Sequence, residues 1–216
     1  MDCSLNHITL APNIPAVHAC ASVCLTTNSC RLYCLRFRLT GNECLIFSAL
    51  VTENWNGDPA SSVTFDVCYS TWYHSGDITN SVSETSVSSI YEQYTTGDKA
   101  VDGFICRQFH QHCFHSDASD NDPSWWRADL GAPRSVTRIM VFPRNDGSSI
   151  THFSNVVITL GNSSVSRENP IFAQIDRGIA GQMMDFTVTT PMIGRYLEFK
   201  TDDELNLVIC EVKIIS

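Results

Sequence analysis

The stretch CRQFHQHCFH (residues 106–115), followed by PSWWRADLG (123–131) and TRIMVFPRND (137–146), decides how this chain is interpreted. The first part places three histidines around two cysteines. The second holds a Trp-Trp-Arg-x-Asp-Leu-Gly pattern that no simple core periodicity requires, and the third is an apolar, strand-length run that ends in Arg-x-Asp. Because rigid β folds carry their binding residues where strands end, we interpret the stretch as a binding site on strand ends.

Segments on the C-terminal side of residue 100 have the pattern of β-strands. They are apolar runs of strand length with partial alternation, bounded by Gly, Pro, Asn and Asp. These runs are residues 138–142, 153–160, 184–189, 194–200 and 205–215. In the last run Val208, Cys210, Val212 and Ile214 share one face, and Glu211 and Lys213 share the other. Long helical periodicity is absent, so the pattern predicts an antiparallel β-sandwich of jelly-roll type.

Length, cysteine content and charge limit the class of protein. The 216 residues leave room for two domains, and ten cysteines predict a disulfide-bonded protein that is secreted or attached to the cell surface. A formal net charge of −9 argues against a nucleic-acid partner. No apolar window of 18 residues predicts a membrane span. The start lacks a signal-peptide pattern, so we expect a mature part of a longer secreted chain.

Chemical motifs favour binding over catalysis. The sequence contains no G-x-S-x-G, H-E-x-x-H or phosphate-loop pattern, so we expect no enzyme activity. Trp125 and Trp126 are expected to divide between surface and core, with Arg127 and Asp129 paired to each other on the opposite face. Asn162 begins the sequon Asn-Ser-Ser and is a candidate glycosylation site.

Residues 3–68 form a separate, cysteine-dense region. They hold seven of the ten cysteines, which indicates that disulfides replace part of a hydrophobic core. Cys20 and Cys24 lie four residues apart, on one face of a predicted short helix, and two strands follow between residues 31 and 47. A Ser/Thr-rich stretch at residues 69–86 marks the boundary, which we place so that the domains are 1–71 and 72–216.

The second region resembles the F-type lectins, the fucose-binding branch of the discoidin-like domains. The resemblance covers about Ser83 to Ser216. It rests on five motifs in the family's order, namely AVDG (100–103), CFH (113–115), PSWWRADLG (123–131), RND (144–146) and CEV (210–212). It implies a secreted lectin with a jelly-roll sandwich and a disulfide between Cys113 and Cys210.

The resemblance also implies a ligand site. The family contacts fucose with a histidine and two arginines, which correspond here to His115, Arg144 and the position of Thr151. Asp146 is expected to hold the Arg144 guanidinium, and His152 is the candidate substitute for the arginine that Thr151 replaces. The family's adjacent cysteine pair after Arg-x-Asp is absent, because Gly147 and Ser148 stand there.

Calcium is the cofactor that the resemblance implies. Its predicted side-chain ligands are Asp102 and Glu211. The backbone carbonyls expected to complete the site belong to Lys99, Phe104, His112 and Cys210. The alternative interpretation is that Asp102 makes an Asx turn before Gly103 and that Glu211 is a solvated strand residue.

The first region resembles PAN/apple domains, in which one helix packs on a sheet. The resemblance implies disulfides between Cys3 and Cys68, Cys20 and Cys44, and Cys24 and Cys30. Cys34 and Cys106 are then left over, either bonded to each other, bonded to another chain or free. We expect the Cys34–Cys106 bond between the domains.

The sequence therefore predicts an extracellular protein that binds a fucosylated glycan or glycoprotein. The first alternative is an adhesion module that binds other extracellular proteins and has lost its sugar pocket at Thr151. The second is attachment to membrane lipid, which requires Phe104, Phe109 and Phe114 at exposed loop tips. A homo-oligomer is expected, because weak single sites gain avidity from multivalency.

Overall fold

The computed structural model describes the chain in two compact units and is mainly β, as the sequence predicted. The described residues are 4–11, 15–27, 30–51, 66–70, 74–106, 112–117, 123–145, 153–165, 168–177, 182–201 and 205–216. The first unit is Met1–Tyr73 with Gly103–Cys106, and the second is His74–Asp102 with Arg107–Ser216. The sequence placed a boundary near residue 72 and did not anticipate that Gly103–Cys106 groups with the first unit.

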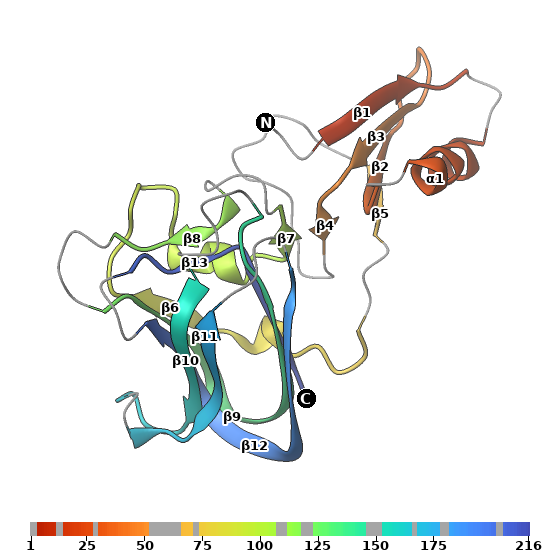
Figure 1. The fold of residues 1–216 in the computed structure, drawn as a ribbon. Helices are drawn as coiled ribbons and strands as arrows, with labels where there is room; N and C mark the ends of the chain where they lie inside the picture. The colour runs from red at the N-terminus through yellow and green to blue at the C-terminus, as the bar shows by residue number, and fades with distance from the viewer. Residues whose placement is uncertain are drawn as a thin grey trace. The chain divides into compact units, whose positions relative to one another are not determined.

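In its described part the first unit is a small sheet with one helix (Figure 1). Its antiparallel strands lie in the order β1 (Ser4–Thr9), β3 (Glu43–Phe47), β2 (Leu32–Arg36) and β5 (Val67–Ser70). Helix α1 (Ala16–Thr26) packs its buried cysteines against this sheet, and β4 (Leu50–Val51) pairs with β7 (Phe104–Ile105). Among the described residues no helix is long and apolar enough to cross a membrane.

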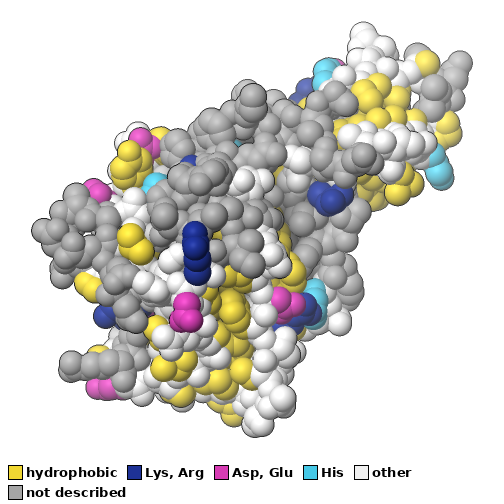
Figure 2. All heavy atoms as spheres, viewed as in Figure 1, with side chains coloured by type: hydrophobic (Ala, Val, Ile, Leu, Met, Phe, Trp, Pro, Cys, Tyr) yellow, Lys and Arg dark blue, Asp and Glu magenta, His cyan; other side chains and the backbone are white. Residues whose placement is uncertain are grey.

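Hydrophobic side chains also reach the surface of the first unit. Figure 2 shows them gathered on the visible face of this unit. In the segment between β2 and β3, Leu39 is fully exposed and Phe37 is half exposed. Elsewhere on this view the described Lys and Arg side chains lie scattered and do not form one basic patch, which agrees with the acidic composition.

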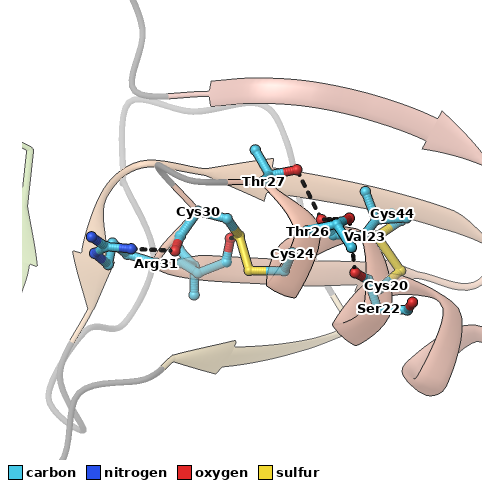
Figure 3. Close-up of a disulfide and its surroundings, with 10 residues drawn as sticks. Cys20, Ser22, Val23, Cys24, Thr26, Thr27, Cys30, Arg31 and Cys44 are labelled. Atoms are coloured by element: carbon cyan, nitrogen blue, oxygen red, sulfur yellow. Dashed lines mark hydrogen bonds between the residues drawn. A yellow bond between two sulfur atoms is a disulfide. The ribbon is translucent and has the colours of Figure 1, made fainter.

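Three disulfides join described residues of the first unit, and two of them are the predicted ones. Cys20 bonds to Cys44 and Cys24 bonds to Cys30, which pins α1 to the sheet and to the segment after the helix (Figure 3). The hydroxyl groups of Thr26 and Thr27 close the last turn by donating to backbone carbonyls of the helix. The small unit therefore replaces part of its missing core by covalent bonds.

The predicted pairs Cys3–Cys68 and Cys34–Cys106 are wrong. Cys34 bonds to Cys68, because β2 and β5 are antiparallel neighbours whose register places these two cysteines opposite each other. Cys106 is disulfide-bonded to a partner outside the described residues, and Cys3 lies outside them as well. Cysteine spacing alone could not reveal this register, because the two strands are joined only by long-range pairing.

The second unit is built on one large antiparallel sheet. Its strand order is β11-β10-β12-β9-β14, with β6 paired to β9. These strands are β11 (Ile171–Arg177), β10 (Ser154–Gly161), β12 (Met184–Thr201), β9 (Trp125–Phe142), β14 (Glu211–Ile215) and β6 (Glu84–Val87). The short strands β8 (Phe114–His115) and β13 (Val208–Ile209) pair with each other, and two short 3-10 helices, η1 (Thr79–Ser81) and η2 (Gly97–Ala100), precede β7.

Two long strands dominate this sheet. The sequence predicted separate strands at residues 184–189 and 194–200, whereas β12 runs through both as one strand. Its pairing with β9 shifts register between Thr187 and Met192, a stretch that contains Pro191, and again between Gly194 and Tyr196. Proline lacks the backbone donor that a regular ladder needs and is tolerated at such irregularities. The breaks in the sequence pattern therefore mark bulges inside one strand.

The adjacent tryptophans divide between core and surface, as predicted. Trp126 is fully buried, donates its Nε1–H to Gly97 O at 2.8 Å and meets the Phe199 ring edge-on at 5.6 Å. Trp125 is only partly buried, and the Arg127 guanidinium lies over its ring at 5.1 Å. Because the Trp126 indole N–H has a partner, its burial costs little of the hydrogen-bond energy that it would have in water.

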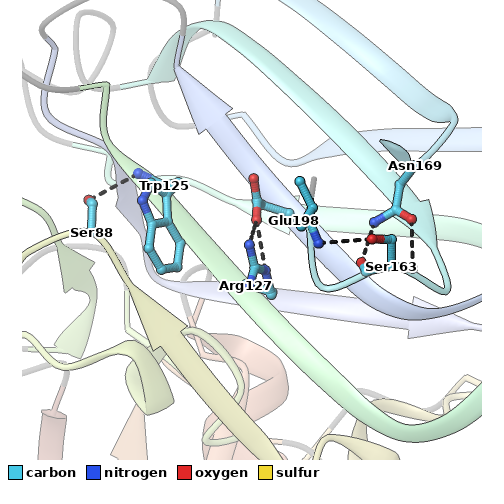
Figure 4. Close-up of polar contacts among 7 residues, drawn as sticks. Ser88, Trp125, Arg127, Ser163, Asn169 and Glu198 are labelled. Atoms are coloured by element: carbon cyan, nitrogen blue, oxygen red, sulfur yellow. Dashed lines mark hydrogen bonds and ion pairs between the residues drawn. The ribbon is translucent and has the colours of Figure 1, made fainter. Parts of the chain in front are cut away.

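The predicted pair of Arg127 with Asp129 is wrong. Arg127 Nε donates to Glu198 Oε2 at 2.7 Å (Figure 4), and Arg195 donates to both carboxylate oxygens of Asp129 at 2.7 and 2.8 Å. Arg127 and Glu198 are directly opposite each other in the β9–β12 register. Side chains in such a cross-strand pair lie closer together than two side chains at positions i and i+2 of the same strand. Arg127 and Asp129 therefore each pair with a residue of the neighbouring strand β12, and not with each other.

Trp126→Phe tests the buried indole. Losing its hydrogen bond to Gly97 and part of its volume is expected to lower the free energy of unfolding by about 2 kcal/mol. The matched change at the neighbouring, partly exposed ring, Trp125→Phe, is expected to cost less than about 1 kcal/mol. Urea denaturation measures both, and equal losses would contradict the division of the two rings.

Two bidentate Arg–Asp pairs make the stability of the second unit depend on pH. A hydrogen bond from Arg195 lowers the pKa of Asp129, and one from Arg138 lowers the pKa of Asp185. A carboxylate with a lowered pKa in the folded state binds fewer protons there than in the unfolded chain. Its stabilisation is therefore present above the unfolded pKa of about 4 and is lost as the pH falls through the folded pKa.

The double variant Asp129→Asn/Asp185→Asn removes both carboxylates. It is expected to be less stable than the unaltered chain at neutral pH and to lose stability less steeply below about pH 4. Thermal unfolding followed from neutral pH to acid measures the slope. An unchanged slope in the double variant would show that other groups cause the acid sensitivity.

Candidate functional site

His115 lies in β8 and is held by backbone contacts on both sides. Its N–H donates to Thr95 O at 3.3 Å, and its carbonyl accepts from Tyr91 N at 2.9 Å. On the other edge β8 pairs with β13, where Val208 lies opposite His115. The residue is buried, so the position of its ring is set by the fold before any ligand arrives.

The Cys113–Cys210 disulfide joins this strand to the end of the chain. The two cysteines are 97 residues apart and are both fully buried. Cys210 N donates to Phe142 O at 2.9 Å, so the last residue of β9 is hydrogen-bonded to one of the two disulfide-bonded cysteines. The predicted bond between the histidine loop and the last strand is confirmed.

Arg144 follows β9 by two residues and is partly buried. It therefore extends from the strand end that contacts Cys210, while His115 extends from the strand that follows Cys113. The disulfide thus links the segments that precede the two predicted ligand residues, which come from distant parts of the chain. Asp146, Thr151 and His152 lie outside the described residues, so their predicted roles stay predictions.

An aromatic residue that the sequence analysis did not select lies beside the histidine. Tyr91 stacks on His115 with ring centroids 4.8 Å apart and an angle of 26° between the planes, and it remains 52% exposed. Asn206 places its Nδ2 at 3.2 Å from His115 Nε2. The available signal was the Ile-Tyr-x-x-Tyr run at residues 90–94, because apolar rings in a polar loop often mark a binding surface.

Comparisons with known proteins point to one family. A family model described as NedA-like, galactose-binding domain matches residues 99–199. Fucolectin of Anguilla anguilla is 30% identical over 118 residues, which are 53% of this chain and 73% of the relative. The chain belongs to the fucolectin family. Fucolectin-3 of Anguilla japonica is 29% identical over 126 residues, which are 56% of this chain and 67% of that relative.

A solved structure agrees with this membership at the level of the fold. The fucolectin from the serum of the striped bass, Morone saxatilis, superposes with a TM-score of 0.60 at 24% identity. The match covers 67% of this chain and only 50% of the striped bass chain. The present member of the fucolectin family therefore spans half the length of that lectin, and the similarity supports its fold.

Five of the six predicted calcium ligands belong to the second unit, and some of the elements that carry them contact one another. Helix η2, with Lys99 near its end, contacts both β8 and β14, and Glu211 begins β14. Asp102 follows η2, His112 precedes β8, Cys210 is disulfide-bonded, and Phe104 belongs to β7 of the first unit. The contacts of η2 with β8 and β14 are of the kind that an ion held by several segments of one unit requires.

The two carboxylates do not fit a calcium ion as they lie. Asp102 Oδ2 is 3.5 Å from Lys99 Nζ, and Glu211 Oε1 is 2.8 Å from Lys213 Nζ. A divalent cation bound to these oxygens would have an ammonium close to each of them. In the described part of the chain no group of three or more His, Cys, Asp and Glu side chains is arranged to hold a metal. Calcium binding stays a prediction.

The sequon lies on an exposed loop. Asn162 is exposed in the bend after β10. The following loop is folded on itself, since Ser163 N donates to Asn169 Oδ1 at 3.0 Å and Asn169 Nδ2 donates to Ser163 O at 2.8 Å (Figure 4). This exposure suits an N-glycan, and glycosylation stays a prediction.

Removing the site disulfide by Cys113→Ala/Cys210→Ala is expected to lower the free energy of unfolding by about 3–5 kcal/mol, since the bond closes a long loop. The amide protons of β8 should then exchange faster with solvent. The matched variant Cys34→Ala/Cys68→Ala opens a loop of 34 residues and should cost less. Hydrogen exchange measures whether the loss of protection is confined to β8. Unchanged protection of β8 in the Cys113→Ala/Cys210→Ala variant would contradict the role of this disulfide in ordering the strand.

Proposed function

We propose that the chain is an extracellular lectin that binds a fucosylated glycan through His115 and Arg144. The observation that carries this proposal is the placement of both residues at strand ends that meet the Cys113–Cys210 disulfide. Family membership and the names of the matched fucolectins support it. The proposed activity is binding alone, and no catalytic step is assigned to the site.

The chemistry of sugar recognition explains why these residue types suit the task. Neutral hydroxyls gain little from weak donors in water, so a site needs charged or aromatic donors that are fixed in advance. His115 is fixed by β8, and Arg144 supplies a planar guanidinium with several N–H donors in a fixed geometry. The half-exposed Tyr91 ring beside His115 offers an apolar surface against which the C–H groups of a sugar can pack.

A second function, contact with another extracellular protein, is favoured by the first unit. The exposed Phe37 and Leu39 lie in one short segment between β2 and β3, and neither contributes to the core of its own unit. Exposed apolar side chains of this kind are typical of protein contact surfaces. The proposed division is that the second unit binds glycan and the first unit contacts a partner protein or a second copy of the chain.

Titration calorimetry of the full chain with L-fucose tests the glycan proposal. Binding in the millimolar range or tighter is expected for the unaltered chain. His115→Ala and Arg144→Ala should each weaken it by about tenfold or more, because each removes a donor worth about 1.5–3 kcal/mol. Arg134→Ala, at an exposed arginine of β9, is the matched control and should bind like the unaltered chain.

The outcome that contradicts the glycan proposal is equally specific. A folded chain that gives no heat with millimolar fucose, and none with a fucosylated oligosaccharide, would have lost the sugar function. A loss of binding in Arg134→Ala as large as that in Arg144→Ala would instead show a nonspecific charge effect. In the first case the partner is to be sought among extracellular proteins.

A further inference from the structure

A fully buried lysine lies at the place where the fucolectin resemblance predicts a calcium ligand. Lys213 and Glu211 are both 0% exposed and lie two residues apart on β14, so their side chains share one face of the strand. Lys213 Nζ is 2.8 Å from Glu211 Oε1 and 3.7 Å from Asp77 Oδ2. We call Lys213, Glu211 and Asp77 the buried charge cluster.

The third member of the cluster is fixed by its own contacts. Asp77 Oδ1 accepts from Thr79 N at 2.9 Å and from Thr79 Oγ1 at 2.6 Å, and Thr79 Oγ1 in turn accepts from Ile214 N at 3.0 Å. Asp77 also forms a β-bridge with Ile215. The segment at the start of the second unit is therefore attached to the last strand by side-chain and backbone bonds, with the ammonium of Lys213 between the two carboxylates.

The electrostatics of this arrangement assign a role to the ammonium. A carboxylate without access to water is tolerated only where a counter-charge is close, and a buried lysine has the same need. Glu211 would obtain its counter-charge from a calcium ion if it were a ligand, but the chain provides one from its own strand. Asp102 has Lys99 at 3.5 Å in the same way. Both predicted ligands are thus neutralised within the protein.

We propose that Lys213, with Lys99 in support, takes the place of a divalent cation and orders this end of the sandwich without metal. The tethered ammonium neutralises Glu211 and Asp77 and links β14 to the start of the second unit. A calcium ion at Glu211 would be repelled by an ammonium 2.8 Å from one of the carboxylate oxygens. The proposal concerns how the fold is stabilised, so it stands whether or not the site binds fucose.

The test compares thermal unfolding of the full chain in a chelator and in millimolar calcium. The unaltered chain is expected to melt at the same temperature in both. Lys213→Met should melt at a clearly lower temperature in chelator, because two carboxylates lose their counter-charge, and calcium should restore part of the loss. Lys200→Met, at an exposed lysine of β12, is the matched control and should show neither effect.

A calcium-dependent rise in the melting temperature of the unaltered chain would overturn the proposal. So would a Lys213→Met variant that is as stable in chelator as the unaltered chain. If Lys213→Met fails to fold, two further measurements decide. Titration calorimetry of calcium into the metal-free, unaltered chain must give no binding, and Lys99→Met, at a partly exposed residue, must lower the melting temperature in chelator.

Discussion

The Cys113–Cys210 disulfide is the constraint on which the site depends. Strands β8 and β13 are only two residues long and pair with each other, and such a short ribbon is not stable by itself. The bond ties the segment before β8 to the residue before β14, and the Phe142 carbonyl accepts the backbone N–H of Cys210. The end of β9 is therefore fixed to the same point. His115 lies two residues after Cys113, and Arg144 lies two residues after Phe142, so both residues are close in sequence to groups that this covalent link holds.

The parts of the fold that follow from local pattern were predictable, and the parts that follow from strand order were not. Apolar runs and turn residues located β10, β14, the end of β9 and both halves of β12, but they gave no counterpart of β11. The four-residue spacing of Cys20 and Cys24 located the helix. The Cys34–Cys68 bond depends on β2 and β5 being neighbours, which no local spacing encodes. The same holds for Arg127, whose partner Glu198 is supplied by the register of a strand about seventy residues later.

The candidate site shows the same division. His115 and Arg144 were found because their positions beside motif residues carry over from the family, and their surroundings then came from the fold. Tyr91 was missed because its contact with His115 arises from backbone bonds between a loop and β8, and not from a motif. A ring stacked on the proposed ligand histidine adds an apolar surface beside a polar donor. The family motifs alone therefore do not describe the full surroundings of His115.

The last strand shows how burial changes the meaning of a pattern. Alternation correctly places Glu211 and Lys213 on one face of β14, and such a pair on a strand is ordinarily solvated. All five residues of β14 are buried, however, so this face is covered and the two charges must neutralise each other. A motif that matches only Glu211 predicts a metal ligand, whereas Glu211 and Lys213 together predict a buried salt bridge. Because the lysine is tethered to the strand, its charge cannot be removed by a chelator, and an ordering role of this kind persists where calcium is scarce.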